Sequence, residues 1–266
     1  MISRLEKNKK IIKKEENHKK IKVILWISFF IFLIILNIII SNKHLVIDEY
    51  RLSFKEIPDN FDSLKIIHFN DLNYTNNKKD LKRIVKEINI RKPDIVLFTG
   101  RISLSSSNND DLIKELSNIK ARLGKYYVGS DNNNVLRRSN FKDISKKIEK
   151  IYLNKDSINL IGIDAKDNKF LELDKDFTIA LIAKADDFDS YQNIKINLAF
   201  SGGEGGIVRV PFIDKGLVPH KENTKYIYGL YDNKYLIASG SGNKYTPFRF
   251  FNPRSIDFLR IAKKLD

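Results

Sequence analysis

Residues 23–40 form an apolar run without a single charged side chain, and its only polar members are Ser28 and Asn37. At about 1.5 Å of rise per residue, a helix of this length spans about 27 Å, close to the ~30 Å hydrocarbon thickness of a bilayer. A buried core helix is the alternative, but helices that are apolar on every face are unusual in soluble proteins. The run therefore predicts a transmembrane anchor over residues 23–41.

The flanks of this run predict its orientation. Residues 1–22 form a basic tail, with nine Lys or Arg against three Glu, whereas the flank that follows is nearly neutral. The stretch Ser41-Asn42-Lys43-His44 lacks the small-residue pattern of a signal-peptide cleavage site. From the positive-inside bias we expect an uncleaved, single-pass anchor in the cell membrane, with a cytoplasmic tail and residues 44–266 outside the cytoplasm.

The charge of the chain is explained by the same topology. Much of the formal net charge of +15 lies in the tail, where basic residues beside a membrane helix contact anionic lipid. The rest is spread along the chain without a basic strip interleaved with aromatic residues. We therefore expect membrane lipid as a partner, through the anchor and the tail, and do not expect nucleic acid.

Composition narrows the chemistry that the chain can perform. There is no cysteine, which excludes disulfides, thiol nucleophiles and cysteine-ligated metals. Only four histidines are present, so a histidine-rich active site is hard to build; they are His18, His44, His68 and His220.

After the anchor, strand and helix patterns alternate. Short β-branched runs predict strands over residues 64–69, 94–98 and 126–128, and apolar residues at helical spacing predict helices over 81–90 and 111–123. This order is typical of an α/β sheet covered by helices. The second half is richer in strands, predicted at 158–163, 179–182, 194–200, 207–210, 226–231 and 235–238. Two further helices are predicted at 141–151 and 253–264, within one domain over 44–266 built on two packed sheets.

The ends of the predicted strands carry a recognisable series of motifs. In chain order these segments are FDSLKIIHFNDLN (61–73), KPDIVLFTGRISL (92–104), GKYYVGSDNNN (124–134), IGID (161–164), SGGEGGIVRVP (201–211) and residues 235–253. Together they resemble the calcineurin-like metallophosphoesterases, most closely the membrane-anchored bacterial members that act on phosphodiesters or lipid-linked pyrophosphates. The resemblance implies a four-layer α/β fold with two packed mixed β-sheets flanked by helices. It also implies a site for two divalent metal ions (Mn, Fe or Zn) that clamp a phosphate.

Residue by residue, the resemblance implies a degenerate metal site. Asp71 matches the first aspartate of the family, but Asn73 stands in place of a histidine ligand, and a neutral amide is a poor substitute for imidazole. Arg101 occupies the position of the aspartate that bridges the two ions. At ~4 Å and an effective dielectric constant near 20, its charge repels a dication by about 8 kcal/mol.

The remaining ligand positions are also altered. In the third motif, Asp131 and Asn132 replace the Asn-His pair if there is no gap, and Ser130 and Asp131 replace it if one residue is deleted. Lys184 stands in place of a later histidine. The tripeptide Gly203-Glu204-Gly205 replaces the His-x-His motif, whatever the placement of the gap.

Neither His68 nor His220 can replace the missing imidazole ligands. His68 precedes Asp71 on the predicted strand and is expected to be a hydrogen-bonded core histidine, whereas His220 lies in a loop far along the chain.

These replacements leave several functions open. The first is a catalytically inactive homologue, a pseudoenzyme with no cofactor, that binds an anionic envelope ligand or a membrane protein. In it, Arg101 and Lys184 either form an anion site or pair with Asp71, Asp131 and Glu204 and fill the pocket. The alternative is an active metal-dependent phosphodiesterase or phosphatase with a non-standard ligand set, acting on lipid-linked or other phosphate esters. A structural interaction module is the third possibility.

Overall fold

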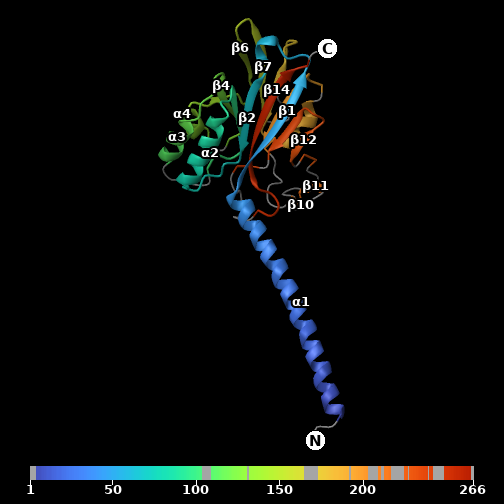
Figure 1. Ribbon diagram of the computed structural model, residues 1–266. Coiled ribbons are helices and arrows are strands. Elements are labelled where there is room, and N and C mark those ends of the chain that lie inside the picture. The colour runs from blue at the N-terminus through green and yellow to red at the C-terminus, as the bar shows by residue number, and fades with distance from the viewer. Residues whose placement is uncertain are drawn as a thin grey trace.

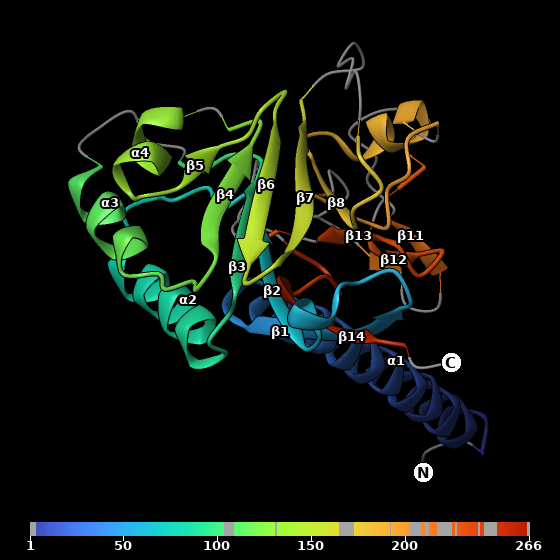
Figure 2. The same cartoon turned by 90° about the horizontal axis from the view of Figure 1, so that it is seen from above.

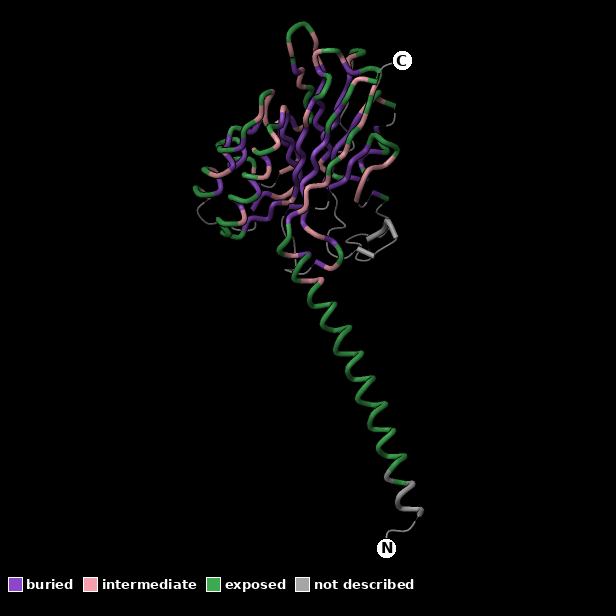
Figure 3. The backbone as a smooth tube through the Cα atoms, in the orientation of Figure 1, coloured by how far each residue is buried: buried purple, intermediate pink, exposed green. Residues whose placement is uncertain are grey.

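The computed structural model describes residues 4–103, 109–130, 132–164, 173–191, 193–202, 209–210, 213–216, 225–226, 228–238, 240–241 and 249–264. Its first element is the helix α1 (Arg4–Lys43), which projects away from the rest of the chain (Figure 1). Apart from the partly exposed Ile38, the large apolar side chains from Val23 to Ile40 are exposed along it. Figure 3 colours most of this helix as exposed. Residues 11–43 are long and apolar enough to cross a membrane. The helix is thus confirmed, while its orientation stays a prediction.

The first sheet has six strands in the order β1-β14-β2-β3-β4-β5. Strands β2 to β5 run parallel, and β14 is antiparallel to β2 and parallel to β1. The bounds are β1 (Leu45–Phe54), β2 (Leu64–Asn70), β3 (Ile95–Thr99), β4 (Gly124–Val128), β5 (Lys142–Asp143) and β14 (Arg254–Lys263).

Three helices cover one face of this sheet, as the view in Figure 2 shows. They are α2 (Lys78–Ile90), α3 (Asp110–Ser117) and α4 (Asn133–Arg138). Helix α2 begins where the Asn77 side chain accepts a hydrogen bond from the backbone N–H of Asp80 at 3.1 Å, an N-cap. Its inward face is apolar at helical spacing and fully buried: Leu81, Ile84, Val85 and Ile88.

The second sheet has the order β12-β13-β9-β8-β7-β6. Strands β7, β8, β9 and β13 are parallel, and β6 and β12 close the edges in the antiparallel sense. The bounds are β6 (Ile148–Leu153), β7 (Asp156–Ile163), β8 (Thr178–Ile182), β9 (Leu198–Gly202), β12 (Gly229–Tyr231) and β13 (Tyr235–Ala238). Smaller elements are the 3-10 helices η1 (Asp59–Phe61) and η2 (Ala185–Tyr191) and a hairpin of β10 (Arg209–Val210) and β11 (Ile213–Gly216).

Three apolar cores separate these layers. One lies between the first sheet and its helices, a second lies between the two sheets, and a third lies under η2 on the outer face of the second sheet. The central strands are apolar on both faces because both faces are covered. The predicted α/β architecture, with two packed mixed sheets flanked by helices and preceded by one apolar helix, is confirmed.

Both helices predicted in the second half of the chain are wrong. Residues 141–151 hold β5 and β6, and residues 254–263 form β14, a central strand between β1 and β2. In β14, Ile256 and Phe258 face the core under the helices, whereas Leu259 and Ile261 face the core between the sheets. A strand buried on both faces shows no alternation, so chance i, i+3 spacings imitate a helix. Strand β1 had no predicted counterpart, and α3 ends at Ser117 rather than at 123.

Candidate functional site

The direction of the strands places the predicted site near the anchor. Strand β1 follows α1 directly, and its first residue, Leu45, lies opposite Arg254 in β14. Because β2 is antiparallel to β14, with His68 opposite Asp257, β2 runs back toward α1. Strands β3 and β4 share its direction. The carboxyl ends of all three strands therefore lie at the end of the domain from which α1 departs (Figure 1).

Strands of the second sheet end at the same edge. A Cβ atom added to Gly202, the last residue of β9, would lie 2.7 Å from Asn70 Nδ2 and 3.1 Å from Thr99 Oγ1. Gly129, after β4, approaches the chain after β7 and β8: an added Cβ would lie 2.4 Å from Ala183 Cβ and 3.1 Å from Asp164 Oδ1. Only glycine permits these approaches. Several of the predicted site residues thus gather at one edge.

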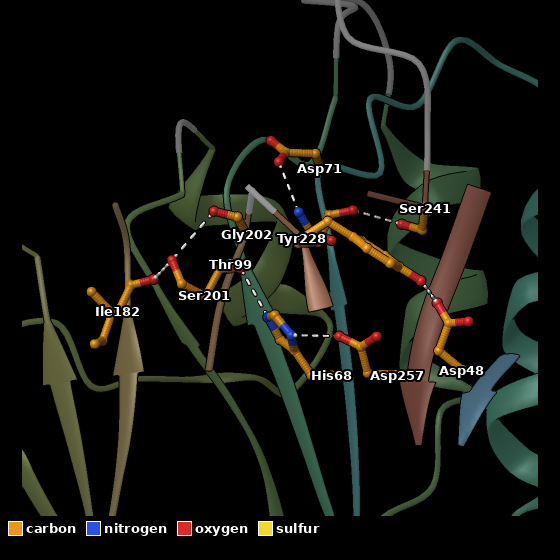
Figure 4. A network of polar contacts seen from close by, with 11 residues as sticks. Asp48, His68, Asp71, Thr99, Ile182, Ser201, Gly202, Tyr228, Ser241 and Asp257 are labelled. Carbon is orange, nitrogen blue, oxygen red and sulfur yellow. Dashed lines mark hydrogen bonds and ion pairs between the residues drawn. The ribbon is translucent and has the colours of Figure 1, made fainter. Parts of the chain in front are cut away.

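The carboxylate of Asp71 accepts two hydrogen bonds from the protein itself. Its Oδ1 accepts the backbone N–H of Arg101 at 3.1 Å, and its Oδ2 accepts the Asn70 amide at 2.9 Å, as Figure 4 shows for the second. The chain turns at Gly100, between the end of β3 and Arg101. There φ is +78°, and an added Cβ would lie 2.5 Å from Asp71 Oδ1. The loop after β3 therefore wraps closely around this carboxylate.

A buried cation, Arg249, acts electrostatically on Asp71. Arg249 is only 4% exposed, and its guanidinium donates to the carbonyls of Gly240 at 3.1 Å and Asn252 at 3.3 Å. Burial and, after it, the charge of Arg254 lower the pKa of Arg249, whereas the negative charge of Asp71 raises it. The sequence analysis did not include Arg249 among the site residues. An arginine inside the aromatic run 248–251 could have indicated a buried cation.

Asn73 and Arg101 form the rim beside Asp71. The Asn73 N–H donates to the carbonyl of Arg101 at 3.3 Å, and its side-chain amide donates to the carbonyl of Asp71 at 3.0 Å. Asn73 is 4% exposed, and its Oδ1 has no hydrogen-bond partner among the described residues. Arg101 is partly exposed. The Asn73 amide nitrogen thus fixes the loop backbone.

His68 is a core histidine, as predicted. It is fully buried, its Nε2 contacts Thr99 Oγ1 at 2.9 Å, and its Nδ1 contacts Asp257 Oδ2 at 3.4 Å (Figure 4). Burial raises the pKa of Asp257, and the neighbouring His68 lowers it. Both ring nitrogens are engaged within the core, so His68 supplies neither a ligand nor a proton to the site edge.

The described replacements in the third motif, Ser130 and Asn132, form hydrogen bonds within their own loop and with the helix that follows. Ser130 Oγ accepts the backbone N–H of Asn132 at 3.4 Å, and Asn132 Oδ1 accepts the N–H of Val135 at 3.4 Å, which caps α4. Asn132 therefore serves the helix that follows β4.

Lys184 lies at the second-sheet side of the edge and is exposed. Burial raises the pKa of Asp164, and the positive charges of Lys146 and, after it, Lys184 oppose this rise. Asp164, directly after β7, is a half-buried carboxylate that the sequence analysis did not include among the site residues, although the buried strand ending in IGID was the signal.

Some predicted site residues cannot be placed. Asp131, Gly203, Glu204, Gly205 and His220 lie outside the described residues.

The described donors do not fit a centre for two metal ions. Such a centre needs several carboxylates and imidazoles around a shared cavity. Within the described ranges, no group of three or more His, Asp or Glu side chains could hold a metal ion. The one retained aspartate, Asp71, is already bonded to Asn70 and to the backbone and is influenced by a buried arginine.

Comparisons with known proteins support the broad family that the motifs indicate. No protein-family model matches the chain. Over 231 residues the chain is 25% identical to a protein of Bacillus subtilis (strain 168) named "Uncharacterized metallophosphoesterase YkuE", and the match covers 76% of this chain and 80% of that protein. The name of this relative implies the use of metal, whereas the described donors of the present chain do not form a metal-binding group.

Proposed function

We propose that this chain is a single-pass membrane protein whose phosphoesterase-like domain lies outside the cytoplasm, has lost hydrolytic activity, and acts by binding. Its ligand is an anionic component of the cell envelope or a membrane protein partner. The exposed apolar helix α1 and the motif-bearing strand ends that face it support this proposal.

The environment of Asp71 carries the proposal. In a working two-metal site the carboxylates and imidazoles are balanced by two dications. Here the Asp71 carboxylate accepts two hydrogen bonds from the protein itself, and the buried Arg249 acts on it electrostatically. A further cation near Asp71 would be repelled by the positive charge of Arg249. Arg101 also stands at the position of the family's bridging aspartate. The edge is thus electrostatically suited to an anion, such as a phosphate group, between Arg101 and Lys184.

A second candidate function is a metal-dependent phosphodiesterase or phosphatase with a non-standard ligand set. Two observations favour it: the name of the relative, and the buried Asn73 Oδ1, an acceptor without a partner among the described residues. Oxygen donors from Asp71, Asn73, Asp131 and Glu204 would suit Mg or Mn better than zinc.

A hydrolysis assay distinguishes the binding protein from the metal-dependent enzyme. The full chain, purified in detergent, is assayed on bis(p-nitrophenyl) phosphate with added Mn²⁺, beside the Asp71→Ala variant. The proposal predicts equal, background rates for both proteins. A rate that falls on substitution of Asp71 would establish the enzyme instead.

A further inference from the structure

A polar cavity lies between the end of α1, the loop after β2, the first turn of α2 and the start of β14. It has a volume of about 170 Å³, and its lining includes Asn42, Asn73, Asp80 and Arg254. A single buried water needs only about 10–15 Å³ of such space. The cavity can therefore accommodate a group much larger than one water.

Two acceptors in the cavity lining lack donors. The Oδ1 atoms of Asn42 and Asn73 are buried and have no hydrogen-bond partner within the described part of the chain. Their amide nitrogens are engaged, with Asn42 Nδ2 donating to Ile38 O at 2.8 Å and Asn73 Nδ2 donating to Asp71 O at 3.0 Å, which fixes each oxygen as the unbonded atom. Buried unpaired acceptors are rare. The lining can therefore accept hydrogen bonds from the hydroxyl groups of a ligand.

A wider basic groove of about 720 Å³ continues from this cavity, since both are lined by Asn42, Asp80 and Arg254. The wall of the groove is formed by residues of α2 that follow one another at intervals of three and four and so share one face of the helix, together with Lys43, the last residue of α1. The basic residues of the groove are the buried Arg254 and the exposed Lys43, Lys79, Lys82, Arg83 and Lys86.

Few acidic groups neutralise this face. Lys82 has a distant partner in Glu115, at 3.8 Å. The two acidic residues of the groove lining, Asp80 and Glu87, pair with Arg254 at 2.7 Å and with Arg91 at 2.9 Å rather than with the exposed lysines. Over the described residues, Lys79 and Lys86 have no ion pair. The face therefore keeps a net positive charge.

The groove lies where α1 leaves its apolar run. Lys43 follows Ile40 by three residues, a rise of about 4.5 Å. Hydrogen bonds hold the domain against this end of the helix: Arg83 Nη1 donates to Lys43 O at 3.3 Å, the backbone N–H of Phe251 donates to Asn37 Oδ1 at 2.8 Å, and Asn42 Nδ2 donates to Arg249 O at 3.4 Å. If α1 crosses the membrane, the basic groove opens at the depth of the lipid headgroups.

We infer that this junction groove binds the headgroup of an anionic, hydroxyl-bearing phospholipid from the leaflet at which α1 emerges. The lysines of α2 contact the phosphate, the headgroup hydroxyls donate to Asn42 Oδ1 and Asn73 Oδ1, and the acyl chains lie along the exposed apolar surface of α1. The site is separate from the Asp71 carboxylate, and the inference rests on the proposed function only in requiring α1 to span the membrane.

Native mass spectrometry of the full chain in detergent micelles tests this inference. Phosphatidylglycerol and phosphatidylcholine with identical acyl chains are titrated separately. We expect phosphatidylglycerol to bind at least tenfold more tightly, because each basic residue near an anionic surface contributes about fivefold. The double variant Lys79→Glu/Lys86→Glu should lose at least tenfold of that affinity.

A matched control reverses two other exposed lysines. Lys155 precedes β7 and Lys195 precedes β9, so both lie at the opposite end of strands that finish at the site edge. Lys155→Glu/Lys195→Glu carries the same change of charge and should bind phosphatidylglycerol as the unmodified chain does. Glycerol 1-phosphate, a headgroup without acyl chains, should not displace the lipid at equal concentration.

The outcomes are distinguishable. Equal binding of the two lipids, equal losses in the two double variants, or displacement by glycerol 1-phosphate would overturn the lipid site and leave the proposed function standing. A chain that stays soluble without detergent and associates with no micelle would overturn the anchor, and with it the proposed function.

Discussion

Asp71→Asn is the substitution that most clearly distinguishes a cation-balanced carboxylate from a metal ligand. In the structure, Asp71 accepts hydrogen bonds from Arg101 N and Asn70 Nδ2 and lies under the influence of the buried Arg249. The asparagine side chain has nearly the same shape but lacks the charge and keeps only one acceptor oxygen. The variant thus loses one accepted hydrogen bond and the charge that opposes Arg249.

The expected loss of stability follows from these two contacts. A hydrogen bond to a charged acceptor contributes about 1.5–3 kcal/mol, and losing the charge of Asp71 also removes its electrostatic attraction to Arg249. Asp71 is only partly buried, so solvent screens part of the second effect. We expect the free energy of unfolding to fall by about 2–3 kcal/mol, which lowers Tm by about 5–10 °C in a domain of this size.

Asp156→Asn provides a matched control. Asp156 also accepts one backbone N–H and one asparagine amide, from Asn60 at 3.0 and 2.8 Å, but it is the first residue of β7, at the opposite end of the strand from the site edge. Its substitution should cost clearly less than that of Asp71. Urea unfolding of the full chain in detergent with EDTA, followed by near-ultraviolet circular dichroism of the tyrosines, measures both; the only tryptophan, Trp26, lies in α1 and does not report on the domain.

The opposite result would refute this reasoning. In a metal site emptied by EDTA, neighbouring carboxylates repel one another, so neutralising one leaves stability unchanged or increases it. If Asp71→Asn is as stable as the unmodified chain in EDTA, and added Mn²⁺ stabilises only the unmodified chain, Asp71 is a metal ligand.

Four further substitutions test other parts of the structure. Gly162→Ala should lower the free energy of unfolding in urea by at least about 2 kcal/mol, because the added Cβ would lie 1.9 Å from Ile144 O; wild-type stability would disprove this close approach. Burial lowers the pKa of Lys125 to about 8, so between pH 8 and its usual value of 10.5 the unfolded chain binds more protons and the free energy of unfolding rises with pH. Lys125→Met should remove that rise in urea titrations at pH 7.5 and 10, and an identical rise in both proteins would contradict it. Arg101→Ala and Lys184→Ala should each weaken binding of inorganic phosphate about fivefold in calorimetric titrations if they form an anion site; unchanged affinity in both would remove that site.

Sequence patterns predicted the parts of the fold that local chemistry determines. The strands β2, β3 and β4 and the helix α2 were predictable because each is a single apolar run or a one-sided apolar face. Strand β14 was not, because it lies between two cores and its apolar residues Phe258, Ile261 and Ala262 imitate helical spacing. Its strand character is set by its neighbours, which lie about 200 residues away in the sequence.

The same limit applies to the candidate site. Asp71 was predictable since it directly follows a buried strand, and His68 was correctly predicted as a core residue. Arg249 was not predicted near Asp71, because the two residues are brought together only when the segment before β14 folds back against the end of β2. That Lys184 shares a cavity with Asp71 stays a prediction; among its described neighbours, Lys184 is one of two lysines whose charges act on Asp164.

Metal content of the full chain tests the central claim most directly. The protein is purified in detergent from cells grown with added manganese, iron and zinc, and elemental analysis is performed before and after dialysis against EDTA. Our account predicts far less than one ion of any of these metals per chain in both samples. The account would be contradicted by one or two ions per chain before EDTA, together with a lower metal content in the Asp71→Asn variant. That result would show that the site holds metal and that Asp71 is one of its ligands.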